Sequence, residues 1–360
     1  MSGREGTGLR YGWTTGACAT ASTAAAYTAL LTGTFPDPVE IVLPKGHRPA
    51  FALARERLGE GFAMAGVVKD AGDDPDVTHG ALVSATVRHG EPGSGVVFRA
   101  GEGVGTITKP GLPLPVGEPA INPVPRQMVR EVVARVAAEH GGSGDVVVEV
   151  SVDGGEELAR RTWNPRLGIL GGLSILGTTG VVVPYSCSAW IESIRRGVDV
   201  ARAEGLQHVA GCTGSTSERV VTELYDLPTE ALLDMGDFAG AVLKYLRRHP
   251  VPRLTVAGGI GKVSKLADGH LDLHSKRSQV NFELLASIAR DAGADAELVT
   301  RVTGANTALE ALQLCTEAGV PLGDLIADRA RAFCLETLRG APISVDVVVI
   351  DRAGTIVGRS

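Results

Sequence analysis

The sequence predicts a two-domain protein in which an α+β domain precedes an α/β domain. Its 360 residues correspond to about two domains of ordinary size. The first half carries several short strand patterns flanked by helical patterns, which predicts a mostly antiparallel sheet. The second half alternates strand, glycine-rich turn and helix, which predicts parallel βα units. We place the domains at 1–160 and 161–340, and a last strand segment, 341–360, can complete either one.

Composition and charge narrow the function classes. Hydrophobic residues make up 44% of the chain and charged residues 21%, as in ordinary globular proteins. The net charge is −6 and no long basic run occurs, so nucleic acid and anionic membranes are not expected as main partners. The five cysteines are widely spaced and form no C-x-x-C pair. This pattern indicates a reduced compartment and argues against a zinc site.

The first domain is expected to pack two helices against a sheet. An alanine-rich helix over 17–31 begins after Thr14 or Thr15, either of which is a suitable N-cap. A second helix follows from Pro125 to about His140, after a loop over 109–125. The expected strands are 39–43, 51–57, 62–69, 82–88, 95–99 and 146–152.

The second domain is expected to repeat strand and helix. The expected strands are 181–183, 208–210, 254–257 and 343–350, and helices are expected over 188–204, from about 216, and over 262–267, 279–292, 305–318 and 323–338. Such units form a parallel sheet with helices on both faces.

No membrane span or export signal is expected. Residues 167–191 carry no charge over a length that would cross a bilayer, but they include five glycines and Pro184. Residues 1–13 lack the apolar core of a secretory signal. The sequence therefore predicts a cytoplasmic protein.

Two turns of the second domain have the composition of a ligand site. Ligands of parallel sheets bind beyond the carboxyl ends of the strands, where helix N-termini present their amides. One turn spans 211–218 and contains Thr213, Gly214, Ser215, Ser217 and Glu218. The other contains Gly258, Gly259, Gly261 and Lys262, and it matches neither a P-loop nor G-x-G-x-x-G. Ordinary helix capping is the alternative explanation for each turn.

An acidic segment of the first domain offers a second candidate. Lys69 and His79 enclose four aspartates within seven positions: Asp70, Asp73, Asp74 and Asp76. The spacing does not match an EF-hand. A metal clip, an anchor for a ligand ammonium, a carboxylate base and a plain Asp-Pro turn all fit the pattern.

The remaining reactive residues point to no definite chemistry. His270 and His274 have the spacing of a metal pair on a helix, but Gly269 favours a loop, and packing is the preferred interpretation. Cys212 lies in a glycine-rich turn without a specific histidine partner. No G-x-S-x-G motif is present, so hydrolase chemistry is not indicated. We expect no protein-bound metal, and the catalytic residues stay unknown.

Several segments together resemble a known family. They are TTGACA (14–19), KDAGDDPDVTHG (69–80), TKPGLPLPVGEPAINPVPRQM (108–128), LGILGGLSILGTTG (167–180) and GHLDLHSKRSQV (269–280). The chain is similar over about 10–350 to the CbiD family of cobalt-precorrin-5B C-1-methyltransferases. The resemblance implies transfer of a methyl group from S-adenosylmethionine to C-1 of a cobalt-containing tetrapyrrole, giving cobalt-precorrin-6A in vitamin B12 synthesis.

Within this interpretation we assign ligands to the candidate residues. The donor is expected at the carboxyl edge of the second domain, with Glu218 near its ribose or ammonium. Its expected contacts are Thr213, Gly214, Ser215, Ser217, Glu218, Gly258, Gly259 and Gly261. The anionic corrinoid is expected in a cleft between the domains. Its candidate contacts are Thr14, Thr15, Lys69, Asp70, Asp73, Asp74, Asp76, His79, Lys109, Lys262, His274 and Arg277.

Two other classes of function stay open. One is a nicotinamide- or flavin-dependent oxidoreductase acting on a tetrapyrrole, against which stands the missing dinucleotide fingerprint. The other is a non-catalytic tetrapyrrole carrier. Donor binding separates the classes, because only the methyltransferase needs S-adenosylmethionine. Assembly into a homo-oligomer is also open.

Overall fold

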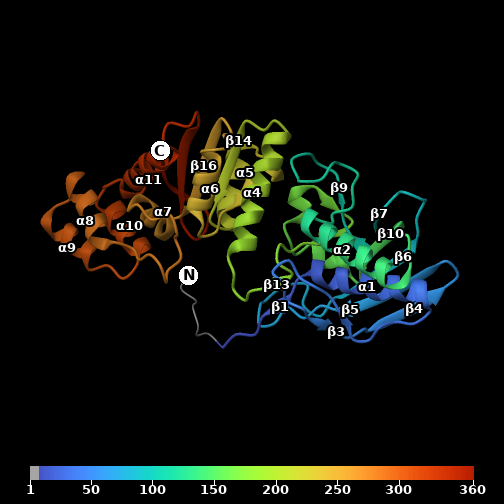
Figure 1. Cartoon of the computed structure of the whole chain (residues 1–360). Coiled ribbons are helices and arrows are strands. Elements are labelled where there is room, and N and C mark those ends of the chain that lie inside the picture. Colours follow the sequence, from blue (N-terminus) through green and yellow to red (C-terminus); the bar gives the residue numbers. More distant parts are fainter. Residues whose placement is uncertain (1–7) are drawn as a thin grey trace. The chain divides into compact units, whose positions relative to one another are not determined.

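A computed structural model describes residues 8–360 as two compact units (Figure 1). The described residues up to Cys187 form the first unit, and Ser188–Ser360 form the second. Residues 1–7, which belong to the segment predicted to carry no export signal, lie outside the described residues. No helix in the described part of the chain is long and apolar enough to cross a membrane.

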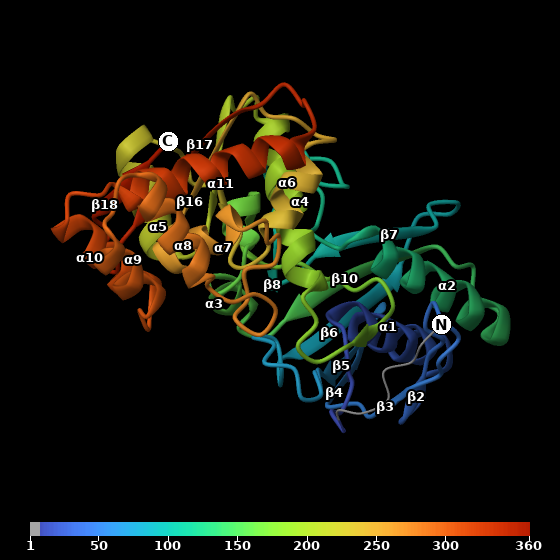
Figure 2. The ribbon, with the colours of Figure 1, turned by 90° about the vertical axis from the view of Figure 1, so that its left-hand side faces the viewer.

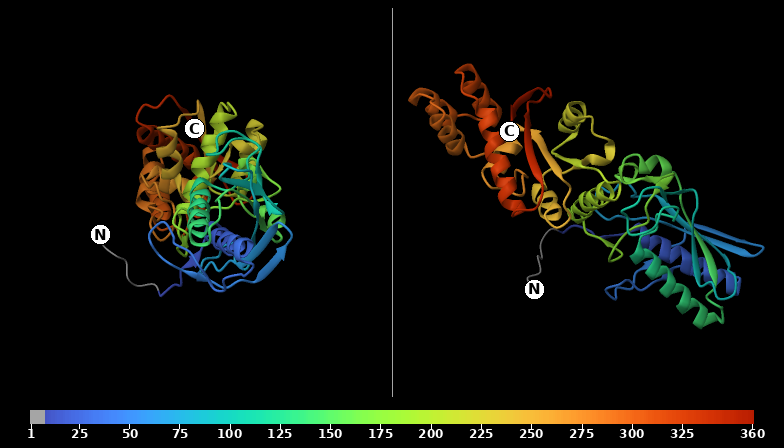
Figure 3. Two further views of the ribbon diagram at one scale, coloured as in Figure 1. Left: turned by 45° about the vertical axis from the view of Figure 1, so that its right-hand side comes forward. Right: turned by 90° about the horizontal axis from the view of Figure 1, so that it is seen from above.

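The first unit packs two helices on one face of a five-stranded sheet. The strand order is β4 (Arg55–Gly59), β5 (Phe62–Val68), β6 (Leu82–His89), β10 (Val146–Val152) and β7 (Val96–Ala100). Every pairing is antiparallel except that of β10 with β7. Helices α1 (Thr15–Thr32) and α2 (Pro123–His140) lie side by side (Figure 3). The predicted helix pair on a mostly antiparallel sheet is confirmed.

Helix α1 is the centre of this unit because its side chains are small. Thr14 is the N-cap, and its hydroxyl accepts a hydrogen bond from the Ala17 amide at 3.2 Å. Nearly all residues of the helix are buried. Alanine on every face lets the strands on one side and α2 on the other approach closely. Gly33 ends the helix in the left-handed conformation.

Two predicted strands of the first unit are wrong in extent. The segment 39–43 pairs only at β2 (Val39–Glu40), and 51–57 divides into β3 (Ala50–Phe51) and β4. The division has a local cause, because the Leu53 amide donates to the Asp37 side chain rather than to a strand. The other short elements are β1 (Gly12–Trp13), β8 (Gly103–Val104), β9 (Thr106–Ile107), α3 (Gly155–Ala159), a 3-10 turn (Asn164–Leu167), β11 (Ile169–Leu170), β12 (Gly172–Leu173) and β13 (Val181–Val182).

The second unit is a parallel sheet with helices on both faces. The strand order is β15 (Leu232–Asp234), β14 (His208–Cys212), β16 (Arg253–Gly259), β17 (Ser344–Ile350) and β18 (Ile356–Arg359), and only β18 runs antiparallel. One face packs on α5 (Ser215–Tyr225). The other face packs on α4 (Ser188–Ala203), α6 (Ala239–Leu246), α7 (Ile260–Ala267) and α11 (Leu322–Leu338) (Figure 2). Helices α8 (Phe282–Asp291), α9 (Ala296–Thr303) and α10 (Ala308–Glu317) extend this layer.

The parallel units are confirmed, but their first strand is wrong. Val181–Val183 was expected to begin the parallel sheet, whereas β13 pairs antiparallel with β1 in the first unit. The apolar run has the length of a buried strand in either sheet, so composition alone cannot assign its partner. The last segment, 341–360, adds β17 and β18 to the second sheet.

Candidate functional site

The carboxyl edge of the second sheet contains a topological switch point. Helix α5 leaves β14 toward one face of the sheet, and α7 leaves the neighbouring strand β16 toward the other. The turns after these two strands therefore diverge, and a divergence of this kind forms a crevice in open parallel sheets. These are the two turns that the sequence selected.

The first turn uses its polar groups to begin α5. The Thr213 amide donates to the Ala257 carbonyl at 3.0 Å, which ties the turn to the neighbouring strand. The Ser217 hydroxyl donates to the Gly214 carbonyl at 2.7 Å. A Cβ atom on Gly214 would find no atom within 4 Å, so the space above this residue is open. Ser215, the first residue of the helix, is exposed.

The second turn differs from the first in how its glycines are used. A Cβ on Gly258 would lie 2.6 Å from the Thr213 hydroxyl, so this glycine lets the two turns touch. A Cβ on Gly259 would meet only the Ile350 carbonyl at 3.9 Å, and one on Gly261 would meet nothing. Neither Gly259 nor Gly261 has a left-handed backbone. Packing and backbone conformation therefore do not require glycine at these two positions.

Lys262 connects the two turns across the switch point. Its Nζ donates to the Thr213 carbonyl at 3.1 Å and pairs with the Asp237 Oδ1 at 3.1 Å. Both side chains are partly exposed, 36% for Lys262 and 24% for Asp237. An ammonium has three donors, so the third N–H of Lys262 can face a ligand. Asp237 was not predicted, because it follows the three-residue strand β15, which the sequence did not reveal.

The segment 271–278 is attached beside this ion pair. The Leu273 amide donates to the Asp237 carbonyl at 2.8 Å, and the Leu273 carbonyl accepts from the buried Lys265 Nζ at 2.9 Å. His274 and Arg277, two predicted substrate contacts, are exposed on this segment. The Arg277 guanidinium binds Asp272 at 2.8 Å. The structure thus brings four predicted residues, Thr213, Lys262, His274 and Arg277, to one edge of the sheet.

The predicted ligands of the acidic segment have partners within the protein instead. Lys69 has only 1% of its side chain exposed, and its Nζ donates to the Asp76 Oδ2 at 2.6 Å. Burial raises the pKa of Asp76, but the Lys69 charge and hydrogen bonds from Lys69 and Thr78 outweigh it, so the net shift is downward. Lys69 is therefore the internal counter-ion of Asp76, and its predicted contact with a substrate carboxylate is not supported.

The other aspartates of this segment bind Arg10 and the backbone of Tyr185. The Arg10 guanidinium binds Asp70, which lowers the pKa of that carboxyl, and the Arg10 amide donates to the Asp73 carboxylate at 2.6 Å. Asp74 accepts from the Tyr185 amide at 2.8 Å. The His79 Nδ1 accepts from the Ala71 amide at 3.1 Å. These contacts correspond to the ordered-turn alternative of the sequence analysis.

The remaining predicted contacts are also used inside the protein. The Thr15 hydroxyl accepts from the Leu176 amide at 3.0 Å, and Thr14 caps α1 as described above. The stem of Lys109 packs against Gly168, and its polar group is engaged. Glu218 is buried and engaged, which leaves it a poor contact for a ribose. Cys212 is fully buried as well.

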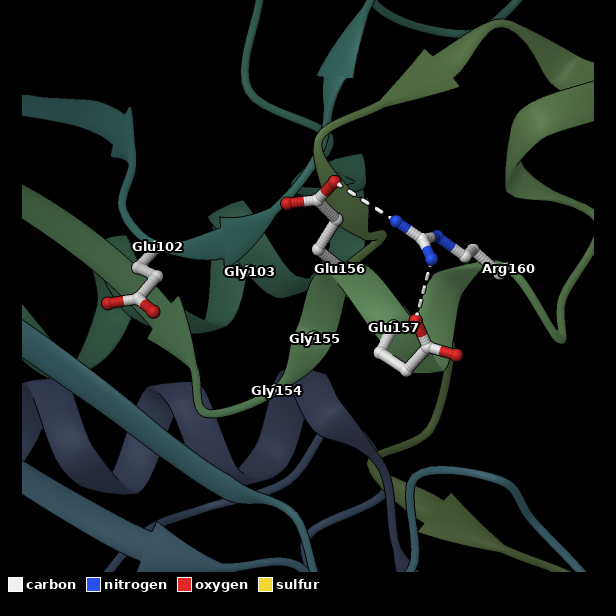
Figure 4. A pocket seen from close by; sticks show the side chains of 7 residues that line it. All are labelled: Glu102, Gly103, Gly154, Gly155, Glu156, Glu157 and Arg160. Carbon is white, nitrogen blue, oxygen red and sulfur yellow. Dashed lines mark ion pairs between the residues drawn. The ribbon is translucent and has the colours of Figure 1, made fainter.

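The first unit contains a hollow that is separate from the two turns. Among residues 8–360, no three His, Cys, Asp or Glu side chains are arranged to hold a metal ion. A hollow of about 320 Å³ lies in the first unit, beside α3 (Figure 4). Its lining includes Glu102, Glu156 and Glu157, with Arg160 pairing to the last two. It contains none of the predicted site residues, and its excess of carboxylates is unsuited to an anionic ligand.

Two family models and several curated relatives match this chain. A family model described as CbiD matches residues 2–184, and one described as CbiD, C-terminal domain, matches 272–360. The cobalt-precorrin-5B C(1)-methyltransferase of Brucella anthropi is 62% identical over 351 residues, 98% of this chain and 95% of the relative. That of Paramagnetospirillum magneticum is 64% identical over 350 residues, 97% and 98% of the two chains. A crystal structure of the cobalamin biosynthesis protein CbiD from Archaeoglobus fulgidus is 24% identical and covers 87% of this chain and 85% of that one, with a TM-score of 0.40.

Proposed function

The chain belongs to the CbiD family, and from this premise we propose that the carboxyl edge of its second sheet binds the methyl donor. The reaction is methylation of cobalt-precorrin-5B at C-1, with S-adenosylmethionine as the donor. The product that the family activity implies is cobalt-precorrin-6A. Family membership thereby replaces the oxidoreductase and carrier alternatives.

The chemistry requires little from side chains. The bond between the sulfonium sulfur and the methyl carbon breaks as the bond from methyl to C-1 forms, with the three atoms in line. The leaving group is a neutral thioether, so no acid is needed to protonate it. The contribution of the protein is to orient the two reactants, which is worth several kcal/mol in well-aligned reactions. This explains why the sequence carries no recognisable catalytic constellation.

One observation supports the donor site more than any other, namely the Lys262–Asp237 pair at the switch point. The amino-acid end of S-adenosylmethionine carries one ammonium and one carboxylate. Lys262 offers its remaining N–H to the carboxylate, and Asp237 offers its second oxygen to the ammonium. This ion pair is partly exposed and, among residues 8–360, has a free N–H and a free carboxylate oxygen. It therefore offers a partner for each of the two charges of a zwitterion.

Two glycines at this edge leave space for a ligand. Gly261 is the second residue of α7, where backbone amides have no partner within the helix. Gly214 stands directly before α5, and its amide donates to the Ser217 hydroxyl at 3.2 Å, so the amides that follow it in the first turn of α5 are the ones left for a ligand. Because neither glycine is needed for packing or conformation, its role is to leave the backbone accessible. Accessible amides at two helix N-termini favour the carboxylate and hydroxyl oxygens of the donor.

The segment 271–278 is the corresponding candidate for the corrinoid. His274 and Arg277 are exposed beside the donor site, and Arg277 is suited to bind a carboxylate with two N–H groups. A polycarboxylate macrocycle held there by its rim would lie next to the methyl donor. The acidic segment of the first unit has no part in this proposal, because Asp70 and Asp76 are paired with Arg10 and Lys69, and Asp73 and Asp74 accept backbone amides of the same unit.

Titration calorimetry with S-adenosylhomocysteine tests the donor site. The wild-type chain is expected to bind one equivalent, with or without a corrinoid present. Lys262→Met removes a charge-assisted hydrogen bond worth about 1.5–3 kcal/mol, so the Kd should rise at least about ten-fold. Lys244→Met is the matched control, because Lys244 is exposed on α6 and makes no ion pair within residues 8–360. Equal Kd values for the two variants would contradict the assignment, and no binding to the wild type would contradict the site altogether.

Location and assembly stay predictions. A cytoplasmic location rests on the cysteine pattern, since Cys187 is an exposed free thiol. The absence of a nucleic-acid partner rests on the net charge. Self-association is tested by sedimentation of the purified chain.

A further inference from the structure

Trp190 lies at the same edge of the sheet, at the carboxyl end of β15. It stands in the first turn of α4, and its Nε1 donates to the Asp234 carbonyl at 2.8 Å, at the carboxyl end of β15. The indole covers Gly236, where an added Cβ would lie 3.0 Å from the Cζ2 of the ring. Gly236 has φ of 54°, a second reason for glycine there.

The indole is fixed in place without being buried. Phe238 meets it edge-on, with ring centroids 6.0 Å apart and an interplanar angle of 62°. Together with the hydrogen bond and the contact with Gly236, this determines the plane of the ring. Even so, 41% of Trp190 is exposed. A tryptophan used only for packing gains its stability by covering its surface, so a rigid and exposed ring is better explained as a binding surface.

The ring lies beside the ion pair of the proposed donor site. The indole covers Gly236, and Asp237, the next residue, pairs with the Lys262 Nζ at 3.1 Å. Lys262 reaches this pair from α7, and its Nζ also donates to the Thr213 carbonyl after β14. The indole and the charged pair are thus both held at the carboxyl end of β15, where one ligand can contact both.

We propose that the indole of Trp190 is the adenine-binding surface of the methyl-donor site. The adenine stacks on the exposed face of the ring, while Lys262 and Asp237 hold the amino-acid end. This inference rests on the proposed function and deepens it, because it assigns the two ends of one ligand to two separate groups.

Two ligands of different length distinguish the contributions of the two ends to binding. S-adenosylhomocysteine has both ends, and methylthioadenosine has the adenosine without the amino-acid group. Trp190→Ala should raise the Kd of both ligands by the same factor, about ten-fold for a lost aromatic stack. Lys262→Met should raise the Kd of S-adenosylhomocysteine alone. Trp190→Phe keeps a smaller aromatic ring and should recover part of the affinity for both, with unchanged thermal unfolding as the check on folding.

Fluorescence provides a readout independent of affinity. The chain has three tryptophans, and a Trp13→Phe/Trp163→Phe variant leaves Trp190 as the only indole. Saturation of this variant with methylthioadenosine should change the indole emission. The inference is overturned if Trp190→Ala binds both ligands as tightly as the wild type, or if the emission of Trp190 is unchanged at saturation. In either case binding of S-adenosylhomocysteine by the wild type would still support the donor site, whereas a wild type that binds neither ligand overturns both.

Discussion

The acidic segment over Lys69–His79 and the carboxyl edge of the second sheet share several residue types but differ in how their polar groups are used. Both combine charged residues with glycines near the ends of strands. In the acidic segment, Asp70, Asp73, Asp74 and Asp76 each bind a group of the same unit. At the carboxyl edge, Gly214 and Gly261 face open space, and the Lys262–Asp237 pair retains unused donors and acceptors.

The comparison shows that residue type does not distinguish an ordered turn from a ligand site. What distinguishes them is whether the charges and hydrogen-bonding groups already have partners within the protein. Burying the Lys69 ammonium would cost several kcal/mol without a counter-ion, so Asp76 is required by the fold itself. Nothing in the fold requires glycine at position 261. A group that the fold does not need, in a position that a ligand can reach, is the better candidate for function.

Asp76→Asn should produce the largest change in stability. The substitution leaves the Lys69 ammonium buried without a counter-ion, and breaking a pair of this kind costs about 3 kcal/mol or more. Urea unfolding measures the loss. Asp291→Asn is the control, since Asp291 is largely exposed and its loss should change the free energy of unfolding by less than about 0.5 kcal/mol. S-adenosylhomocysteine binding below the unfolding transition should be unchanged, and a fall in affinity would restore the acidic segment as a ligand site.

The same carboxyl makes stability depend on pH. The pKa of Asp76 is lower in the folded chain than the value of about 3.9 expected when unfolded. A depressed pKa means that the unfolded state takes up the proton more readily, so the contribution is full above the unfolded pKa and is lost as pH falls through the folded pKa. Wild type should therefore lose more stability than Asp76→Asn when the pH is lowered from 5 to below 3. Parallel curves for the two proteins would show that the pair contributes nothing.

The elements that the sequence predicted correctly are those with strong local patterns. Helix α1 has an N-cap and a long run of mostly small residues, and β10 has a valine at every buried position of its seven residues. The missed strand β15 has only three residues, and its position is decided by pairing with β14. The apolar run 181–183 fits either sheet, so its place beside β1 depends on contacts across the chain.

The candidate site was predicted in part for the same reason. The turns after β14 and β16 could be located because each follows a strand and contains several glycines. Asp237 and Trp190 could not, because both are brought to the edge by β15 and by the packing of α4 on it. Lys69 was expected at a ligand because burial of a lysine cannot be detected from a stretch of charged neighbours.

Gly261→Ala tests whether the carboxyl edge is open for a ligand. Position 261 is helical and has space for a methyl group, so the variant should be more stable by about 0.5–1 kcal/mol. The same methyl group should obstruct the backbone and raise the Kd of S-adenosylhomocysteine several-fold. Gly258→Ala is the contrast, because its Cβ would collide with the Thr213 hydroxyl and should destabilise the fold by about 1–3 kcal/mol. Unchanged donor binding by a stabilised Gly261→Ala would show that the open space is unused.

The two regions each contain an exposed arginine bound to an aspartate. Substituting each of these two arginines compares the regions most sensitively. Arg10 binds Asp70 in the acidic segment with 59% of its side chain exposed, and Arg277 binds Asp272 beside the donor site with 65% exposed. Exposed ion pairs contribute about 0–1 kcal/mol, so Arg10→Gln and Arg277→Gln should affect stability equally little.

Steady-state methylation at saturating donor should nevertheless distinguish them. Arg277→Gln should raise the KM for cobalt-precorrin-5B a few-fold without changing kcat, because a contact with a rim carboxylate is the same in the ground and transition states. The increase should shrink at high salt, where exposed charges are screened. Arg10→Gln should leave KM unchanged. Equal KM values for the two variants would remove segment 271–278 from the corrinoid site. A raised KM for Arg10→Gln alone would place the corrinoid at the acidic segment. It would also show that a side chain whose charge is paired within the protein can still bind the substrate.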